Sequence, residues 1–348
     1  VTTQTFYMDQ PYRVIIDLSE VVFTLDVDEV FKPSGLIKNV RAGRISKGRS
    51  RIVITLTKPA EIIRASLQKV LDEDYFRLVV DLDESSSERF ATLLNAQKLV
   101  LGESGNVASK GDRVSPVKKK DGSFTIVLDP GHGGIDGGAV GRLKTKEKDV
   151  VLDFAKELEM QLQGAGPFQV ELTRREDVFM SLRQRLDFNR RMQADLFISI
   201  HADSLRDRRV RGSTIYTLSK KASDQLSERL AESENSVDQL AGLSSDTDKQ
   251  AVTDILIDLT TRETKVFSRQ FARILMTSLD DEIKLIKNPV RSAAFGVLKA
   301  PDVPGVLLEL GYLSNAEDEK LLRADEWRKK AAKAVKQAIV GFFEPRVQ

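Results

Sequence analysis

The sequence predicts an α/β domain, with a mostly parallel twisted sheet flanked by helices, preceded by an all-β sandwich domain. The first observation behind this prediction is size, because 348 residues that are 41% apolar exceed what one hydrophobic core usually serves. The second is that short runs rich in Val, Ile and Leu fill residues 1–101. The third is that strands alternate with amphipathic helices from residue 124 onward, which is typical of a parallel sheet covered by helices.

The strands of the first domain are predicted at residues 12–18, 21–25, 50–56 and 76–82. The first and last of these runs echo each other, as YRVIIDL and FRLVVDL, and the third run, SRIVITL, is a weaker copy. A sandwich with internal pseudo-symmetry would produce such echoes. Unrelated buried strands also share this composition, so both interpretations stay open.

A change of composition separates the two domains. Residues 102–123 consist mainly of Gly, Ser, Lys and Asp, with few bulky apolar side chains, which is typical of a linker. The predicted organisation is therefore a first domain at 1–101, a linker at 102–123 and a second domain at 124–348.

In the second domain we predict strands at 125–128, 169–173, 196–200, 212–218 and 305–310, and helices at about 147–162 and 181–192. Ser181 and Gln184 form a capping box at the start of the second helix. Two further helical stretches, 222–240 and 252–279, belong to an insertion at about 220–284. Long insertions between strands of one sheet are usually functional.

Charge and composition restrict the class of function. Residues 222–263 carry ten acidic and three basic side chains, so a local charge of −7 leaves +9 for the rest of the chain. An acidic flap on a basic body does not favour a nucleic-acid partner. The chain has no Cys, so a metal ion must be bound by His, Asp or Glu. No transmembrane segment is expected, and the N-terminus lacks signal-peptide features, which fits a mature secreted protein or a cytosolic one.

The two histidines of the chain each follow an apolar run that reads as a strand, His132 after 125–128 and His201 after 196–200. Since the carboxyl ends of parallel strands share one edge, both imidazoles are expected there, and Glu147 opens the helix that follows His132. Two imidazoles and a carboxylate are the ligand set of a catalytic zinc site with an open position. A single such histidine is more often structural, and a Glu in a first helical turn is common, but the combination favours a metal.

Glu309 is a carboxylate inside the apolar run VLLEL at 306–310. Burial of a charge is costly unless the group is paired or functional. Near a metal it could accept a proton from water and return it to a leaving amine, the duty of a general base and acid. A buried ion pair is the alternative explanation.

Four motifs resemble, in order and spacing, the zinc-dependent N-acetylmuramoyl-L-alanine amidases of bacterial cell-wall turnover: TIVLDPGHGG at 125–134, KEKD at 146–149, FISIHAD at 197–203 and LELGYLSN at 308–315. The resemblance covers about residues 124–343. It implies that His132, Glu147 and His201 bind Zn²⁺, that Glu309 is catalytic, and that peptidoglycan is cut between N-acetylmuramic acid and the L-alanine of the stem peptide.

The first domain resembles the AMIN domain, which often precedes such amidases and targets them to cell-wall material or the division site. This resemblance implies a β-sandwich. With the second domain it implies a periplasmic protein that is exported with a signal peptide absent from this chain.

The insertion resembles that of the regulated amidases of Gram-negative cell division. On its first helix Leu226, Leu230, Val237 and Leu240 form one apolar stripe, and Glu234 lies within that stripe. We hypothesise that this helix covers the active site and that Glu234 occupies the open zinc position until a protein activator, of the LytM-domain type, displaces the helix. Glu232 should point away and be inert. The alternative is an ordinary amphipathic helix on which Glu234 reaches solvent.

Two other functions stay open at this point. One is a non-catalytic peptidoglycan-binding protein on a degenerate amidase scaffold, which the intact set of His and Glu residues disfavours. The other is a zinc peptidase that cuts within the stem peptide. Arg291, just after the insertion, is a further candidate substrate contact.

Overall fold

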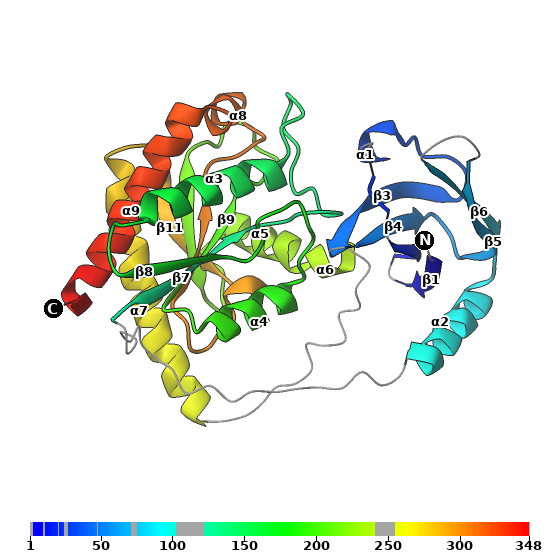
Figure 1. Cartoon of the computed structure of the whole chain (residues 1–348), viewed down its shortest axis with the longest axis horizontal. Coiled ribbons are helices and arrows are strands. Elements are labelled where there is room, and N and C mark those ends of the chain that lie inside the picture. Colours follow the sequence, from blue (N-terminus) through cyan, green and yellow to red (C-terminus); the bar gives the residue numbers. More distant parts are fainter. Residues whose placement is uncertain are drawn as a thin grey trace. The chain divides into compact units, whose positions relative to one another are not determined.

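The structure, a computed structural model, describes residues 3–9, 11–19, 21–23, 27–46, 48–70, 75–101, 122–240 and 255–347. The described residues divide into two compact units: residues 3–101 together with 239–240 belong to the first, and residues 122–238 and 255–347 form the second (Figure 1). Nearly all of the predicted linker at 102–123 lies outside the described residues.

The first unit contains a four-stranded antiparallel sheet and a separate hairpin. The sheet has the order β1-β2-β4-β3, and the hairpin pairs β5 with β6. The bounds are β1 (Thr3–Met8), β2 (Arg13–Ser19), β3 (Ile37–Ser46), β4 (Arg49–Leu56), β5 (Ala60–Lys69) and β6 (Phe76–Glu84). Val14 and Ile54 from the sheet share a core with Leu78 and Val80 from the hairpin, so the predicted β-sandwich is confirmed.

Two helices of this unit, α1 (Val27–Val30) and α2 (Ser87–Leu101), were not predicted. The hydroxyl of Ser86 accepts a hydrogen bond from the backbone N–H of Arg89, which caps the start of α2. Phe90 anchors the helix, because its buried ring packs edge-on against Tyr7 and Tyr12. The sequence prediction missed α2 because its apolar residues run directly into the linker and show only weak periodicity.

The second unit is built on a six-stranded sheet of order β11-β10-β12-β9-β7-β8. Its strands are β7 (Phe124–Pro130), β8 (Phe168–Leu172), β9 (Leu196–His201), β10 (Ser213–Leu218), β11 (Leu285–Ala293) and β12 (Gly305–Glu309). β10 runs antiparallel to β12, and the other neighbouring pairs are parallel. The predicted mostly parallel sheet is therefore confirmed, with one reversal.

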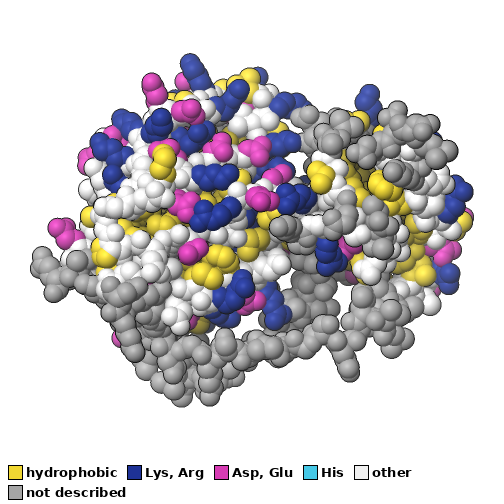
Figure 2. All heavy atoms as spheres, viewed as in Figure 1, with side chains coloured by type: hydrophobic (Ala, Val, Ile, Leu, Met, Phe, Trp, Pro, Cys, Tyr) yellow, Lys and Arg dark blue, Asp and Glu magenta, His cyan; other side chains and the backbone are white. Residues whose placement is uncertain are grey.

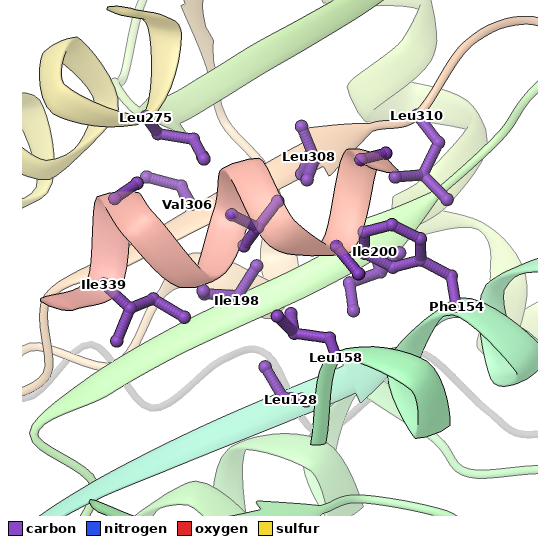
Figure 3. Close-up of a cluster of buried hydrophobic side chains, with 14 of the residues drawn as sticks. Leu128, Phe154, Leu158, Ile198, Ile200, Leu275, Val306, Leu308, Leu310 and Ile339 are labelled. Atoms are coloured by element: carbon purple, nitrogen blue, oxygen red, sulfur yellow. The ribbon is translucent and has the colours of Figure 1, made fainter. Parts of the chain in front are cut away.

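Successive side chains along each strand point to opposite faces of the sheet, and both faces are apolar. One face packs against α3 (Glu147–Leu162), α7 (Ile255–Asp280) and α9 (Asp325–Val347), with α8 (Ala316–Leu322) beside α9. Figure 3 shows its core, which includes Leu128, Phe154, Ile198, Leu308 and Ile339. The opposite face, with Val127, Phe197, Tyr216 and Leu307, packs against α4 (Leu182–Met192), α5 (Gln225–Asn235) and the 3₁₀ turn η2 (Gly296–Leu298).

The region predicted as a helical insertion has two structural roles. Its first stretch forms α5 and the short α6 (Val237–Leu240). The second stretch forms α7, whose Phe271, Leu275 and Leu279 are fully buried in the core against α9, so this helix belongs to the scaffold. The edge strand β11 was missed because it is rich in polar residues and contains Pro289, which edge strands tolerate.

Neither the surface charge nor the helices of the described residues favour a nucleic-acid or a membrane-spanning protein. On the face drawn in Figure 2, Lys and Arg side chains of the second unit are interspersed with Asp and Glu, unlike the uniform basic surface of a nucleic-acid binder. The residues at 241–254 of the predicted acidic flap lie outside the described part of the chain. Within the described residues, no helix is long and apolar enough to cross a membrane.

Candidate active site

The predicted residues lie at one edge of the sheet, at the ends of three strands and at the start of α3. His201 is the last residue of β9 and Glu309 is the last residue of β12, and the two lie opposite each other in the parallel β9–β12 ladder. His132 follows β7, the neighbour of β9 on its other side. Glu147 is the first residue of α3. The topology therefore brings together the four residues that the sequence singled out.

The loop after β7 depends on glycine to bring the histidines together. A Cβ atom at Gly131 would lie 2.6 Å from Nε2 of His201, so a side chain there would displace that ring. His132 itself has φ 58°, in the left-handed region that non-glycine residues rarely adopt. The two imidazole rings lie 4.9 Å apart at an interplanar angle of 79°.

One oxygen of Glu147 lies close to a nitrogen of each histidine. Nε2 of His132 lies 3.1 Å from Oε1 of Glu147, and Nδ1 of His201 lies 3.2 Å from the same oxygen. Ligand atoms of a tetrahedral zinc ion are about 3.3–3.4 Å apart, given bonds of about 2.0–2.1 Å. Nε2 of His132 is buried without a hydrogen-bond partner among the described residues, which suits a nitrogen whose lone pair binds a metal.

Hydrogen bonds fix the orientation of His132 and Glu147. Nδ1 of His132 lies 2.7 Å from Oδ2 of Asp136, an arrangement that directs Nε2 of a metal-binding histidine toward the ion. The carboxylate of fully buried Glu147 accepts the backbone N–H groups of Ala139 and Ala202, each at 2.8 Å. These contacts hold both side chains in place before any ion binds.

The charge balance of the site also favours a cation. Burial lowers the pKa of His132, but the carboxylates of Asp136, Glu147 and Glu234 raise it well above its ordinary value overall. Burial raises the pKa of Glu147, whereas the two histidines bring it well below its ordinary value. A divalent cation would neutralise this excess of carboxylates, so the residues fit a metal centre.

Glu309 has the environment of a group that exchanges protons. Its side chain is fully buried. Oε2 accepts the backbone N–H of Asp203 at 3.0 Å, and Oε1 has no hydrogen-bond partner among the described residues. Burial and the charges of Glu147 and Asp203 raise the pKa of Glu309 well above its ordinary value. Perturbed carboxyls of this kind are typical of catalytic acids and bases.

Glu234, on α5, lies at the same centre. Its Oε1 is 3.9 Å from Nε2 of His132, and its Oε2 is 3.4 Å from Nδ1 of His201. Ligand atoms of His132, His201 and Glu234 lie within 4.8 Å of one another. Glu234 is 7% exposed, so it does not reach solvent as the alternative explanation required. Glu232 is exposed, as expected.

The apolar stripe around Glu234 agrees in part with the expectation. Leu230 and Val237 are buried and Leu226 is half-buried, whereas the side chain of Leu240 lies outside the described residues. Leu230 packs in the core of the α5 face of the sheet. Burial of these side chains attaches α5 to the edge where the histidines lie.

Arg291 lies apart from the candidate metal ligands. It lies on β11 and donates to Oδ1 of Asp224 at 3.2 Å and to the carbonyl of Asn288 at 3.0 Å. Asp224 is the N-cap of α5. These contacts make Arg291 a support for the start of α5, and a role in substrate contact stays a prediction.

Asp136 was not predicted as a partner of His132. A signal for it existed, because metal-binding histidines usually pair their second nitrogen with a carboxylate, and Asp136 follows His132 by four residues. Arg174 and Arg185, which contact the backbone of the same loop, were also missed. They are more than forty residues away from the loop in sequence, and no local sequence pattern predicts that they contact it.

Comparison with known proteins identifies the family of this chain. Residues 126–340 match the family described as N-acetylmuramoyl-L-alanine amidase (Amidase_3), and residues 1–82 match the AMIN domain. N-acetylmuramoyl-L-alanine amidase AmiC of Escherichia coli O6:H1 is 32% identical over 351 residues, covering 97% of this chain and 83% of that protein. AmiC of Neisseria meningitidis serogroup B is 31% identical over 355 residues, covering 99% of this chain and 85% of that protein.

Among solved structures, the amidase AmiC2 of Nostoc punctiforme is 27% identical with a TM-score of 0.47, covering 64% of this chain and 97% of that chain. The matched residues 126–340 include His132, Glu147, His201 and Glu309. The chain therefore belongs to the N-acetylmuramoyl-L-alanine amidase family, enzymes that hydrolyse the amide between N-acetylmuramic acid and L-alanine in peptidoglycan, and it carries an AMIN domain before the catalytic domain.

Proposed function

We propose that this amidase is zinc-dependent and autoinhibited, and that it acts on peptidoglycan in the periplasm during cell division and daughter-cell separation. The observation that carries the metal-dependent reaction is that one oxygen of Glu147 lies 3.1 and 3.2 Å from nitrogens of two buried histidines, with Glu309 opposite His201. Two imidazoles and a carboxylate suit Zn²⁺.

The residues divide the chemistry between them. A zinc ion bound by His132, Glu147 and His201 would polarise the scissile carbonyl and lower the pKa of a water molecule. Glu309 accepts a proton of the attacking water as the water oxygen bonds to the carbonyl carbon, and Oε1, which has no hydrogen-bond partner among the described residues, is the available atom. Glu309 then returns the proton to the amine of L-alanine as the amide bond breaks. Asp136 keeps His132 in the orientation that binding requires.

The position of Glu234 supports the proposed autoinhibition. A zinc site with three protein ligands has one position left for water or substrate, and the carboxylate of Glu234 is within reach of that position. While α5 stays in place, neither water nor the scissile carbonyl can use it. Activity then requires a partner protein that moves α5, for which a LytM-domain activator is the candidate.

The AMIN domain supports the proposed location. Its match over residues 1–82, together with the AmiC relatives, favours a protein that works at the cell wall. We place this amidase in the periplasm, with the first domain holding it near peptidoglycan while the second domain hydrolyses it.

Digestion of purified sacculi tests the proposed reaction. The full chain and its Glu234→Gln variant should release intact stem peptides that begin with L-alanine when loaded with Zn²⁺, and nothing after chelation. Mass spectrometry identifies the products. Fragments cut within the stem peptide would indicate the zinc peptidase instead. Absence of products from both proteins, with no bound metal, would indicate the non-catalytic binder.

Asn235 provides a test of how α5 is held. Its Nδ2 donates to the carbonyl of Ala294 at 2.9 Å, and its Oδ1 accepts the N–H of Gly296 at 2.6 Å. A Cβ atom at Gly296 would lie 2.8 Å from that Oδ1. Asn235→Ala and Gly296→Ala should therefore each raise the basal rate of muropeptide release, by about fivefold for each hydrogen bond that is lost, since one hydrogen bond contributes about 1 kcal/mol.

The control for this test is Ser233→Ala, an exposed position on the same helix, which should keep the parent rate. In a Glu234→Gln background the Asn235→Ala change should add little, because the blocking carboxylate is already lost. Basal rates that equal the parent rate in both single variants would show that the hydrogen bonds of Asn235 do not hold α5 over the site.

A further inference from the structure

Two arginines from distant parts of the sequence are buried beneath the loop that carries His132. Arg174 follows β8 and Arg185 lies on α4, and each is 3% exposed. A guanidinium group is almost never this buried without a full set of acceptors. Here most of the acceptors are backbone carbonyls of the loop and its neighbours, which links the arginines to the metal site.

Arg174 joins the segments that carry two of the metal ligands. Its Nε donates to the carbonyl of Pro130 at 3.0 Å. Its Nη2 donates to the carbonyls of Gly131 at 2.8 Å and Lys148 at 2.7 Å, and its Nη1 donates to that of Glu176 at 3.2 Å. Gly131 directly precedes His132, and Lys148 directly follows Glu147. One guanidinium therefore sets the spacing between the loop and the first turn of α3.

Arg185 holds the same loop from the side of α4. Its Nη2 donates to the carbonyl of His132 at 2.8 Å, and its Nη1 donates to that of Pro130 at 3.0 Å. Nη1 also contacts Oδ1 of Asp129 at 2.5 Å, and Nε donates to the carbonyl of Met180 at 3.2 Å. The three consecutive carbonyls of residues 130–132 thus all accept hydrogen bonds from Arg174 and Arg185.

Asp129 anchors this arrangement. It is fully buried, and it accepts hydrogen bonds from the hydroxyls of Thr173 at 2.6 Å and Ser199 at 2.9 Å. Burial raises the pKa of Asp129, but Arg185 and the two hydroxyls bring it below its ordinary value overall. Burial and the charge of Arg185 lower the pKa of Arg174 to about 10, so Arg174 is still charged at neutral pH.

The backbone of His132 explains why the loop needs such support. A residue with φ 58° keeps that conformation only when its surroundings fix it, and here the position of Nε2 depends on it. We infer that Arg174 and Arg185 are positioning residues for the metal centre, which act through the carbonyls of residues 130–132 to keep His132 and Glu147 at ligand distance. The inference rests on the proposed metal site.

Zinc affinity tests this inference in the full-length chain. Arg174→Lys and Arg185→Lys keep the charge, but a single ammonium cannot bridge acceptors as a planar guanidinium does. We expect the dissociation constant for Zn²⁺, measured by chelator competition, to rise about 10- to 100-fold in each variant, as for other residues that orient metal ligands. The matched controls are Arg175→Lys and Arg183→Lys, since these neighbouring arginines are exposed. Both controls should bind zinc like the parent.

Thermal unfolding with and without Zn²⁺ separates positioning from a structural role. A positioning role shrinks the increase in Tm that zinc produces, because that increase depends on metal affinity. A structural role lowers both Tm values equally and leaves the increase and the dissociation constant unchanged, which would overturn the inference. If the parent chain shows no zinc-dependent increase, the proposed metal site fails, independently of the arginines.

A milder change covers the case in which a lysine variant does not fold. Thr173→Val removes one donor to Asp129 and leaves both arginines in place. We expect it to weaken zinc binding several-fold. A dissociation constant for Zn²⁺ equal to that of the parent in this variant would also contradict the positioning role of the two arginines.

Discussion

Glu309→Gln is expected to reduce kcat by about 10²- to 10⁴-fold, the contribution typical of a general acid–base group. The amide of Gln has nearly the same shape as the carboxyl group but cannot accept a proton from water. Its side chain can still accept the backbone N–H of Asp203, as Oε2 of Glu309 does at 3.0 Å. The measurement is the initial rate of stem-peptide release, taken in a Glu234→Gln background so that inhibition by α5 does not limit it.

Two controls accompany this variant. Zinc content and dissociation constant should match those of the parent, since His132, Glu147 and His201 are unchanged. Glu319→Gln alters another fully buried carboxylate, whose oxygens accept the backbone N–H groups of Arg142 and Leu143. It should lower Tm while kcat stays within a few-fold. A Glu309→Gln variant with nearly the parent rate would show that Glu309 is not the general acid–base group of the reaction.

The positions of His132, His201 and Glu309 could be predicted because topology alone places them. Each follows or ends an apolar strand, and the carboxyl ends of parallel strands meet at one edge whatever the details of packing. The four family motifs predict the same positions for these residues. The structure then supplies what the motifs lack, such as the 3.1 and 3.2 Å spacings around Oε1 of Glu147.

Contacts that depend on packing could not be predicted in this way. Arg185 reaches a carbonyl 53 residues away in sequence, and nothing in the pattern of α4 distinguishes it from the exposed Arg183 beside it. The same reason explains why α7 was grouped with the inserted helix. Its amphipathic sequence fits either a movable element or a scaffold helix, and only burial of Phe271 and Leu275 against the core decides between them.

Glu234→Gln is expected to raise the basal rate of stem-peptide release about 10- to 100-fold. The amide cannot provide the negative charge that favours a place beside two histidines and a cation, so the closed arrangement loses stability relative to the open one. An enzyme that is active in only a small fraction of its molecules gains rate in proportion to the open fraction. A tenfold gain corresponds to about 1.4 kcal/mol in that equilibrium.

Glu232→Gln is the matched control, because it makes the same chemical change two residues away on the exposed side of α5. It should keep the basal rate of the parent. Equal basal rates in the Glu234→Gln variant and the parent would rule out the blocking role, whatever the two variants do to stability.

Hydrogen exchange distinguishes release of α5 from a general loss of stability. In the Glu234→Gln variant the amides of α5 should exchange faster, while those of the central strand β9 keep the parent rates, because β9 lies in the sheet and does not depend on the lost contact. An activator that works by displacing α5 must provide the free energy that holds α5 in place, to which Glu234 contributes. By reciprocity it should then bind the Glu234→Gln variant more tightly than the parent, by the same factor through which the variant raises the open fraction.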